Sequence, residues 1–332
     1  MIRTIKKYLK LIEIVLKHGR WKHSGENFNQ RRRESLIELQ DFVPHLYKKP
    51  GNFKNIFYHL SFGEVRARPS KAVFEIPLQN CRTPLSDGTT LPFRKNAIAR
   101  NLVAQLAFLK KSLPTAGGHL TANKLSYIRI AKSASTSMCK AMLEKVYPAL
   151  KQKTISEQQV NYLADANLIA QATNSNNHTY FTIVRNPLVR LVSVYRGFFE
   201  NNSPGFIYRD YLFGVLPQHL SFSDFVNRVI CIPDRLKDQH LKPQYCFLEY
   251  YEKKNITVKI FKLEDTEKIN PFLNQNNLQL PHLNKSAERY DYRLYFTTNL
   301  LKVACEVYQK DIERFGYKAE VEALKGYIKT VH

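Results

Sequence analysis

Two segments of this chain combine hydroxyl and cationic side chains in patterns that suit anion binding. In residues 127–137 (YIRIAKSASTS), an apolar run leads into small hydroxyl residues around Lys132. In residues 181–196 (FTIVRNPLVRLVSVYR), a second apolar run ends at Arg185, and Ser193 follows in the next element. A lysine among hydroxyls and an arginine near a serine are groups that bind phosphate. The two segments therefore predict two anion sites, as a ligand with phosphate groups at both ends would need.

The elements that carry these side chains are two strand–helix units. We expect strands near 125–131 and 179–185, followed by helices near 136–147 and 188–200. Pro187 fits the first position of a helix, and Asn186 can cap it. Ligands of open α/β sheets bind where strands deliver their carboxyl ends to helix starts, and helix N-termini favour anions. The hydroxyl run lacks the glycines and the Gly-Lys-Ser/Thr of a Walker A loop, and N-capping by its serines is the simplest alternative.

The rest of the chain continues the alternation of strands and helices. A further strand is expected near 257–263, with helices near 266–275 and 293–313. Continuously apolar strands between helices predict an α/β fold with a mainly parallel central sheet, covered by helices on both faces. Residues 114–118 (PTAGG) indicate a loop and a candidate domain boundary. Before it, we expect a strand at 71–79 and a helix at 96–113 in an extension of unknown role.

The amino-acid composition indicates which binding partners the protein favours and in which cellular compartment it is located. The formal net charge of +23 favours polyanionic partners, although scattered lysines fit a generally basic solvated surface equally well. There are five cysteines and no CxxC motif, so the sequence suggests neither a zinc cluster nor a disulfide framework. Reduced cysteines indicate a cytoplasmic protein.

The first 18 residues have apolar side chains at the spacing of an amphipathic helix. Lysines interrupt this segment too often for it to span a bilayer. Two interpretations stay open: a helix packed on the protein, and a peripheral contact with the inner membrane surface.

The two anion-binding segments together resemble those of sulfotransferases that use 3′-phosphoadenosine-5′-phosphosulfate. Three further segments extend the likeness to the chondroitin/dermatan group of carbohydrate sulfotransferases (sulfotransferase family 2) and its bacterial relatives. Residues 237–244 (KDQHLKPQ) resemble a D-x-H-W-x-P-Q element, with Leu241 in place of tryptophan. Residues 283–286 (LNKS) and 308–317 (YQKDIERFGY) resemble the C-terminal portion. The likeness covers about residues 122–318.

The resemblance implies a P-loop-like three-layer fold and a division of the chain into an extension (1–120), a sulfotransferase core (121–320) and a tail (321–332). It implies that Lys132 is both catalytic and nucleotide-binding, and that Arg185 and Ser193 hold the 3′-phosphate of the donor. The remaining expected nucleotide contacts are Ser133, Ala134, Ser135, Thr136, Ser137, Lys285 and Ser286. The reaction would move a sulfuryl group to a carbohydrate hydroxyl of a polysaccharide or glycolipid and needs no metal.

The acceptor hydroxyl needs a base, and His240 in the D-x-H-x-x-P-Q element is the first candidate. A neutral imidazole suits proton removal near pH 7. Asp238 is a weaker candidate for orienting it, and Glu264 and Asp265 are reserve candidates for the base.

Two rival functions are a nucleotide-dependent kinase and a non-catalytic basic protein that binds nucleic acid or anionic glycan. The arginines gathered around the second strand–helix junction favour the sulfotransferase, for which we expect no nucleic-acid partner.

Overall fold

The computed structural model describes residues 118–167, 178–200, 216–217, 220–231, 234, 237, 239–280 and 290–331. The elements expected at 1–18, 71–79 and 96–113 lie outside the described residues, so these expectations stay predictions. No helix in the described part of the chain combines the length and the apolar character needed to cross a membrane.

A four-stranded sheet forms the centre of the fold. Its strands, in their order across the sheet, are β1 (His119–Ala122), β2 (Leu125–Ile128), β3 (Thr179–Val184) and β5 (Val258–Lys262). β2, β3 and β5 are parallel, whereas β1 pairs with β2 in an antiparallel hairpin. Every residue of β2 is buried, as expected of a strand covered on both faces. The parallel strands deliver their carboxyl ends to the same edge, where both anion-binding segments begin.

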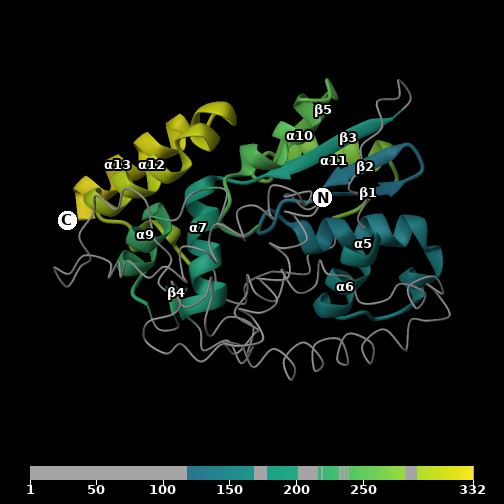
Figure 1. Ribbon diagram of the computed structural model, residues 1–332, viewed down its shortest axis with the longest axis horizontal. Helices are drawn as coiled ribbons and strands as arrows, with labels where there is room; N and C mark the ends of the chain where they lie inside the picture. Colours follow the sequence, from purple (N-terminus) through teal and green to yellow (C-terminus); the bar gives the residue numbers. More distant parts are fainter. Residues whose placement is uncertain are drawn as a thin grey trace, which may run out of the picture.

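Helices cover both faces of this sheet and make it the middle of three layers (Figure 1). Tyr127, Phe181 and Ile183 point to one face, where they pack in a single apolar core with three helices. These helices are α5 (Ser135–Val146), α6 (Glu157–Asn167) and α11 (Thr266–Gln275). The 3₁₀ turn η2 (Pro148–Gln152) connects the first two.

Side chains that alternate with these, such as Ile128 and Val184, point to the second face and a larger core. Its long helices are α7 (Pro187–Tyr195), α9 (Phe222–Cys231), α12 (Thr298–Arg314) and α13 (Lys318–Val331). Its short elements are the π-helix η3 (Arg196–Glu200), β4 (Leu216–Pro217), η5 (Gln244–Phe247), α10 (Glu249–Glu252) and η6 (Tyr292–Tyr295). Figure 1 shows α7, α9, α12 and α13 grouped to one side of the strands.

The expected fold class, an α/β fold with a mainly parallel sheet between helical layers, is confirmed. The strand–helix units begin and end within a few residues of the expected positions. One difference matters for the site: the second helix does not continue as an α-helix to residue 200, because it widens into the π-helix η3 after Tyr195. The segment 321–331 is part of α13, and its Val321, Leu324 and Ile328 are buried in the second core.

Candidate active site

The loop between β2 and α5 carries Lys132 in a constrained backbone. Lys132 and Ala134 both adopt left-handed conformations, with φ of 65° and 55°. A left-handed non-glycine residue costs roughly 1–2 kcal/mol, and such residues cluster at ligand-binding loops. Ala134, whose side chain cannot accept a hydrogen bond, is the N-cap of α5. None of the serines therefore caps this helix, so the N-capping interpretation of the hydroxyl run is not supported.

The hydroxyl residues differ in exposure along this loop. Ser133, Ser135 and Ser137 are buried, whereas Lys132, Ala134 and Thr136 are half-buried. The chain thus turns at the start of α5 with its lysine and Thr136 partly open to solvent. A helix start that carries a lysine and hydroxyls can bind an anion, because the helix dipole and the lysine charge both favour negative groups there.

Arg185 directly follows β3, beside this loop. Its guanidinium Nη1 donates to the Lys132 carbonyl oxygen at 3.3 Å. Asn186 follows and caps α7: its Oδ1 accepts from the amides of Leu188 at 2.9 Å and Val189 at 3.4 Å. The predicted cap is therefore present. The two sequence segments that predicted anion sites are brought together at the same edge of the sheet.

Gln244 joins these segments from a third part of the chain. The side chain is fully buried, and its Oε1 accepts from the Ser133 hydroxyl at 3.1 Å and from the Arg185 amide at 2.9 Å. Its Nε2 donates to the Arg185 carbonyl oxygen at 2.8 Å. One amide side chain thus fixes the loop before α5 against the end of β3. Buried polar groups that are fully hydrogen-bonded in this way specify a single local geometry.

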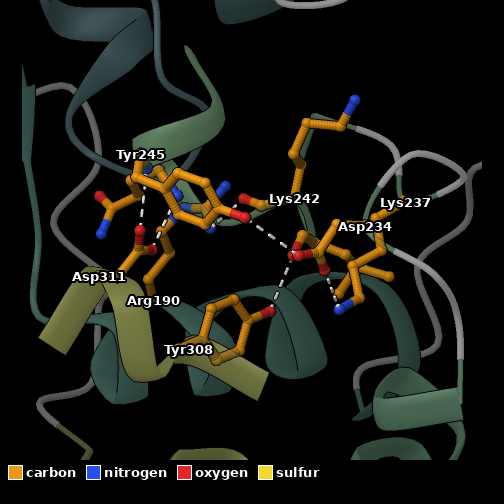
Figure 2. A network of polar contacts seen from close by, with 9 residues as sticks. Arg190, Asp234, Lys237, Lys242, Tyr245, Tyr308 and Asp311 are labelled. Atoms are coloured by element: carbon orange, nitrogen blue, oxygen red, sulfur yellow. Dashed lines mark hydrogen bonds and ion pairs between the residues drawn. The ribbon is translucent and has the colours of Figure 1, made fainter. Parts of the chain in front are cut away.

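Asp311 of α12 holds Gln244 in turn. Its carboxylate accepts from the amide of Gln244 at 2.7 Å and from that of Tyr245 at 2.8 Å (Figure 2). Burial raises the pKa of Asp311 to about 6, although both amides and the charge of Arg190 act in the opposite direction. At neutral pH the carboxylate is ionised and can accept both amides. The C-terminal helices are thereby tied to the edge of the sheet where the anion-binding segments meet.

Lys132 and His240 approach the same aromatic ring. The Lys132 Nζ lies 4.7 Å from the centre of the Phe198 ring, and the His240 ring packs edge-on against Phe198 at 4.8 Å between centroids. Phe198 belongs to the π-helix η3, and π-helical turns occur frequently at functional sites. The structure therefore places the predicted lysine and the predicted base around one side chain.

Gly197 leaves room for the amine of Lys132. A Cβ atom at this position would lie 2.9 Å from the Lys132 Nζ, closer than a carbon and a nitrogen can approach without a shift. The absence of a side chain at residue 197 is thus part of what positions the lysine.

The remaining predicted residues have different surroundings. Ser193 and Val189 are both half-buried and lie one helical turn apart on α7. That Ser193 binds a phosphate together with Arg185 stays a prediction.

Glu264 accepts from the Asn186 amide at 2.8 Å and from the Tyr317 hydroxyl at 2.9 Å. Asp265 caps α11 and pairs with Lys268 at 2.8 Å. These contacts give both reserve carboxylates structural roles and leave His240 as the better candidate for the base.

Some predicted residues cannot be placed. Asp238, Lys285 and Ser286 lie outside the described residues. Within the ranges that the structure does describe, no three His, Cys, Asp or Glu side chains are grouped as metal ligands would be. The expectation of a metal-independent reaction stays a prediction.

Sequence reasoning assigned no role to Gln244, Asp311, Phe198 or Gly197. Gln244 lies in 237–244 and Asp311 in 308–317, two of the segments that contributed to the family resemblance, but the resemblance assigned neither residue a role. The partners of Gln244 are mostly main-chain groups, which carry no sequence signal. Gly197 had a weak signal, because a glycine inside an expected helix costs about 1 kcal/mol and usually has a packing or functional reason.

Comparison with known protein families gives a match to one family. Residues 121–318 match the profile described as the Sulfotransferase family. Searches of curated proteins and of solved structures give no significant match. The matched range runs from β1 to the start of α13 and includes both anion-binding segments. It covers more than half of the chain, and the general reaction that it supports is sulfuryl transfer by a transferase. The chain belongs to the Sulfotransferase family.

Proposed function

We propose that this protein transfers a sulfuryl group from 3′-phosphoadenosine-5′-phosphosulfate to a hydroxyl of a carbohydrate. The observation that carries the proposal is the junction of the two anion-binding segments. Arg185 Nη1 donates to the Lys132 carbonyl, and Gln244 bonds both Ser133 and Arg185. Cationic side chains from two neighbouring strand ends thus surround one edge of the sheet, which suits a donor with phosphates at both ends.

Lys132 is the group we assign to the phosphosulfate end. During transfer, the bond between sulfur and the bridging phosphate oxygen breaks, and negative charge builds on that oxygen. A lysine and the main-chain amides at a helix start stabilise such charge. Thr136, which is partly open to solvent, and the main-chain amides of the same loop would add donors. Arg185 with Ser193 would bind the 3′-phosphate, which distinguishes this donor from ATP.

His240 is the group we assign to the acceptor. Its imidazole would take the proton of the acceptor hydroxyl while the acceptor oxygen forms the new bond to sulfur. The products are the sulfated acceptor, adenosine 3′,5′-bisphosphate and a proton on the histidine. The packing of His240 on the ring that Lys132 also approaches supports this role. A general base of this kind contributes about 10²–10⁴ in rate.

The acceptor class and the location are part of the same proposal. The likeness of residues 237–244 to the carbohydrate group favours a polysaccharide or glycolipid acceptor. The net charge of +23 suits an anionic one. We place the reaction in the cytoplasm, with the inner membrane surface as the site where a glycolipid acceptor would be met.

Isothermal titration calorimetry tests the nucleotide site without knowledge of the acceptor. We expect adenosine 3′,5′-bisphosphate to bind at least about tenfold more tightly than AMP, because a charge-assisted contact with the second phosphate contributes roughly 1.5–3 kcal/mol. Arg185→Ala should remove most of this preference, whereas Arg293→Ala, which changes an exposed arginine of η6, should not. Equal affinities of the wild type for both nucleotides would contradict the proposed donor.

A screen with ³⁵S-labelled donor tests the reaction. Polysaccharide and glycolipid acceptors are offered in parallel, and transfer of label is measured after separation from the nucleotide. A labelled carbohydrate supports the proposal. Tight bisphosphate binding with label transferred only to a non-carbohydrate hydroxyl would keep the donor and overturn the acceptor class.

A further inference from the structure

Arg190 is an arginine in the interior of the protein. It lies on the core-facing side of α7 with only 1% of its surface exposed, between buried apolar neighbours such as Leu191 and Val194. Arginine is almost never fully buried unless its donors are satisfied. A buried arginine at this position therefore has a role beyond packing.

Its donors go to main-chain carbonyls of two separate segments. Nε donates to the carbonyl of Ala131 at 2.9 Å, in the loop between β2 and α5. Nη2 donates to the carbonyl of Gln239 at 2.9 Å, and Nη1 to that of Lys242 at 3.0 Å. The planar guanidinium presents its donors in a fixed fork, so these bonds fix the two segments relative to each other as well as to α7.

The residues beside these carbonyls are the two predicted catalytic ones. Ala131 directly precedes Lys132, and Gln239 directly precedes His240. Both side chains then approach Phe198, which stands eight residues after Arg190 in the element that continues α7. The main chain of each segment is thus held by Arg190, and the side chain of each packs on Phe198.

Asp311 completes the arrangement from the other side. It lies close enough to Arg190 for the positive charge to lower the pKa of its carboxyl, against the effect of burial. The same carboxylate binds the amides of Gln244 and Tyr245, just after Lys242 (Figure 2). Tyr308 of α12 donates to the Leu241 carbonyl at 2.9 Å. The segment that carries His240 is therefore bound at both ends by buried polar groups.

From this geometry we infer that Arg190 is a positioning residue for sulfuryl transfer, which sets the distance and orientation between Lys132 and His240. The inference rests on the proposed function. Arg190 directs Nε, Nη1 and Nη2 at the protein main chain, so it acts on the reaction through the lysine and the histidine.

Histidine NMR tests this coupling without an acceptor. The imidazole signal of His240 is assigned in isotope-labelled protein by its loss in His240→Gln, and its chemical shift and pKa are measured with and without adenosine 3′,5′-bisphosphate. In the wild type we expect the bound nucleotide to change both values. Arg190→Lys keeps the charge but cannot reach three carbonyls, so the response should shrink by half or more while calorimetry still detects binding. Arg293→Lys, a change at an exposed arginine, should respond like the wild type.

Turnover with the acceptor found by the screen gives the second readout. Arg190→Lys should lower kcat on the order of 100-fold at saturating substrates, as a displacement near 1 Å does, and should change the bisphosphate Kd less than about tenfold. In a His240→Gln background the same change should lower kcat less than about threefold, because the histidine is already lost. Circular dichroism and thermal unfolding verify that each variant is folded.

The outcomes distinguish a failure of the proposed function from a failure of the positioning role of Arg190. A wild type that does not prefer the bisphosphate contradicts the proposed function, and this inference with it. If the wild type binds and transfers but Arg190→Lys retains full turnover, or lowers kcat by the same factor in both backgrounds, only the positioning role is overturned. An unchanged response of the His240 signal in Arg190→Lys has the same meaning.

Discussion

At the scale of single residues, the candidate site depends on how Lys132, Phe198 and His240 meet. The lysine and the histidine come from segments far apart in the sequence, yet both lie near 5 Å from the centre of the same ring. A cation over an aromatic face is attracted by the ring, so Phe198 also limits where the lysine amine can rest. Small changes around this ring should therefore alter binding and catalysis with little effect on folding.

Gly197→Ala is one such change. The new Cβ would displace the Lys132 amine, which is the end of a flexible side chain, so we expect a loss of bisphosphate affinity of about 3- to 10-fold and little loss of stability. Calorimetry and thermal unfolding measure the two effects. Gly326→Ala is the matched control, because a Cβ there meets no atom within 4 Å. Unchanged affinity in Gly197→Ala would show that the Lys132 amine does not need this space.

His240→Ala tests the base. Removal of the imidazole should lower kcat by about 10²–10⁴ and leave the bisphosphate Kd nearly unchanged, because the proton is removed from the acceptor and not from the nucleotide. Label transfer and calorimetry give the two values. Full turnover in this variant would place the base elsewhere.

At the scale of elements, one amide side chain connects the loop before α5 with the end of β3. Gln244 makes this connection and is itself fixed through Asp311 of α12. The site therefore depends on a C-terminal helix that supplies no predicted nucleotide contact. Disturbing this connection should affect both anion-binding segments at once.

Gln244→Ala leaves the Ser133 hydroxyl and the main-chain groups of Arg185 without their partner. Each buried polar group left unsatisfied costs about 1–3 kcal/mol, so the unfolding free energy should fall by at least this amount. Bisphosphate affinity should fall about tenfold or more, because both segments move. Denaturant unfolding and calorimetry measure these effects, with Gln309→Ala on the exposed side of α12 as the control. Reduced stability with full affinity would limit Gln244 to a role in folding.

At the scale of the whole molecule, two buried titratable groups respond to acid in opposite directions. Burial, together with the nearby His178, lowers the pKa of His119 from 6.5 to about 4, and burial raises that of Asp311 from 3.8 to about 6. Below pH 6.5 the unfolded chain binds a proton at His119 that the folded protein does not, so this group reduces stability as the pH falls. Asp311 contributes stability that is present below pH 3.8 and lost as the pH rises through 6.

The difference between the wild type and His119→Gln isolates the histidine. Between pH 6.5 and pH 4 the wild type should lose up to about 3 kcal/mol of unfolding free energy relative to the variant. Above pH 6.5 the difference should be constant, and it reflects only the packing on Tyr180 and the 2.9 Å hydrogen bond to Tyr251. Denaturant unfolding at a series of pH values measures it. A difference that does not change with pH would mean that His119 titrates alike in both states.

The alternation of strands and helices, the strand ends next to Lys132 and Arg185, and the family could all be predicted from the amino-acid sequence. These features are local: apolar runs, a proline at a helix start and short ordered motifs all act between near neighbours in the chain. That Arg190, Gln244 and Asp311 are buried and connect separate segments, and that Glu264 binds Asn186 and Tyr317, could be seen only in the folded protein. Most of their hydrogen-bond partners are main-chain groups of distant segments. Every residue type offers the same main-chain groups, so folding alone selects which of them a side chain meets.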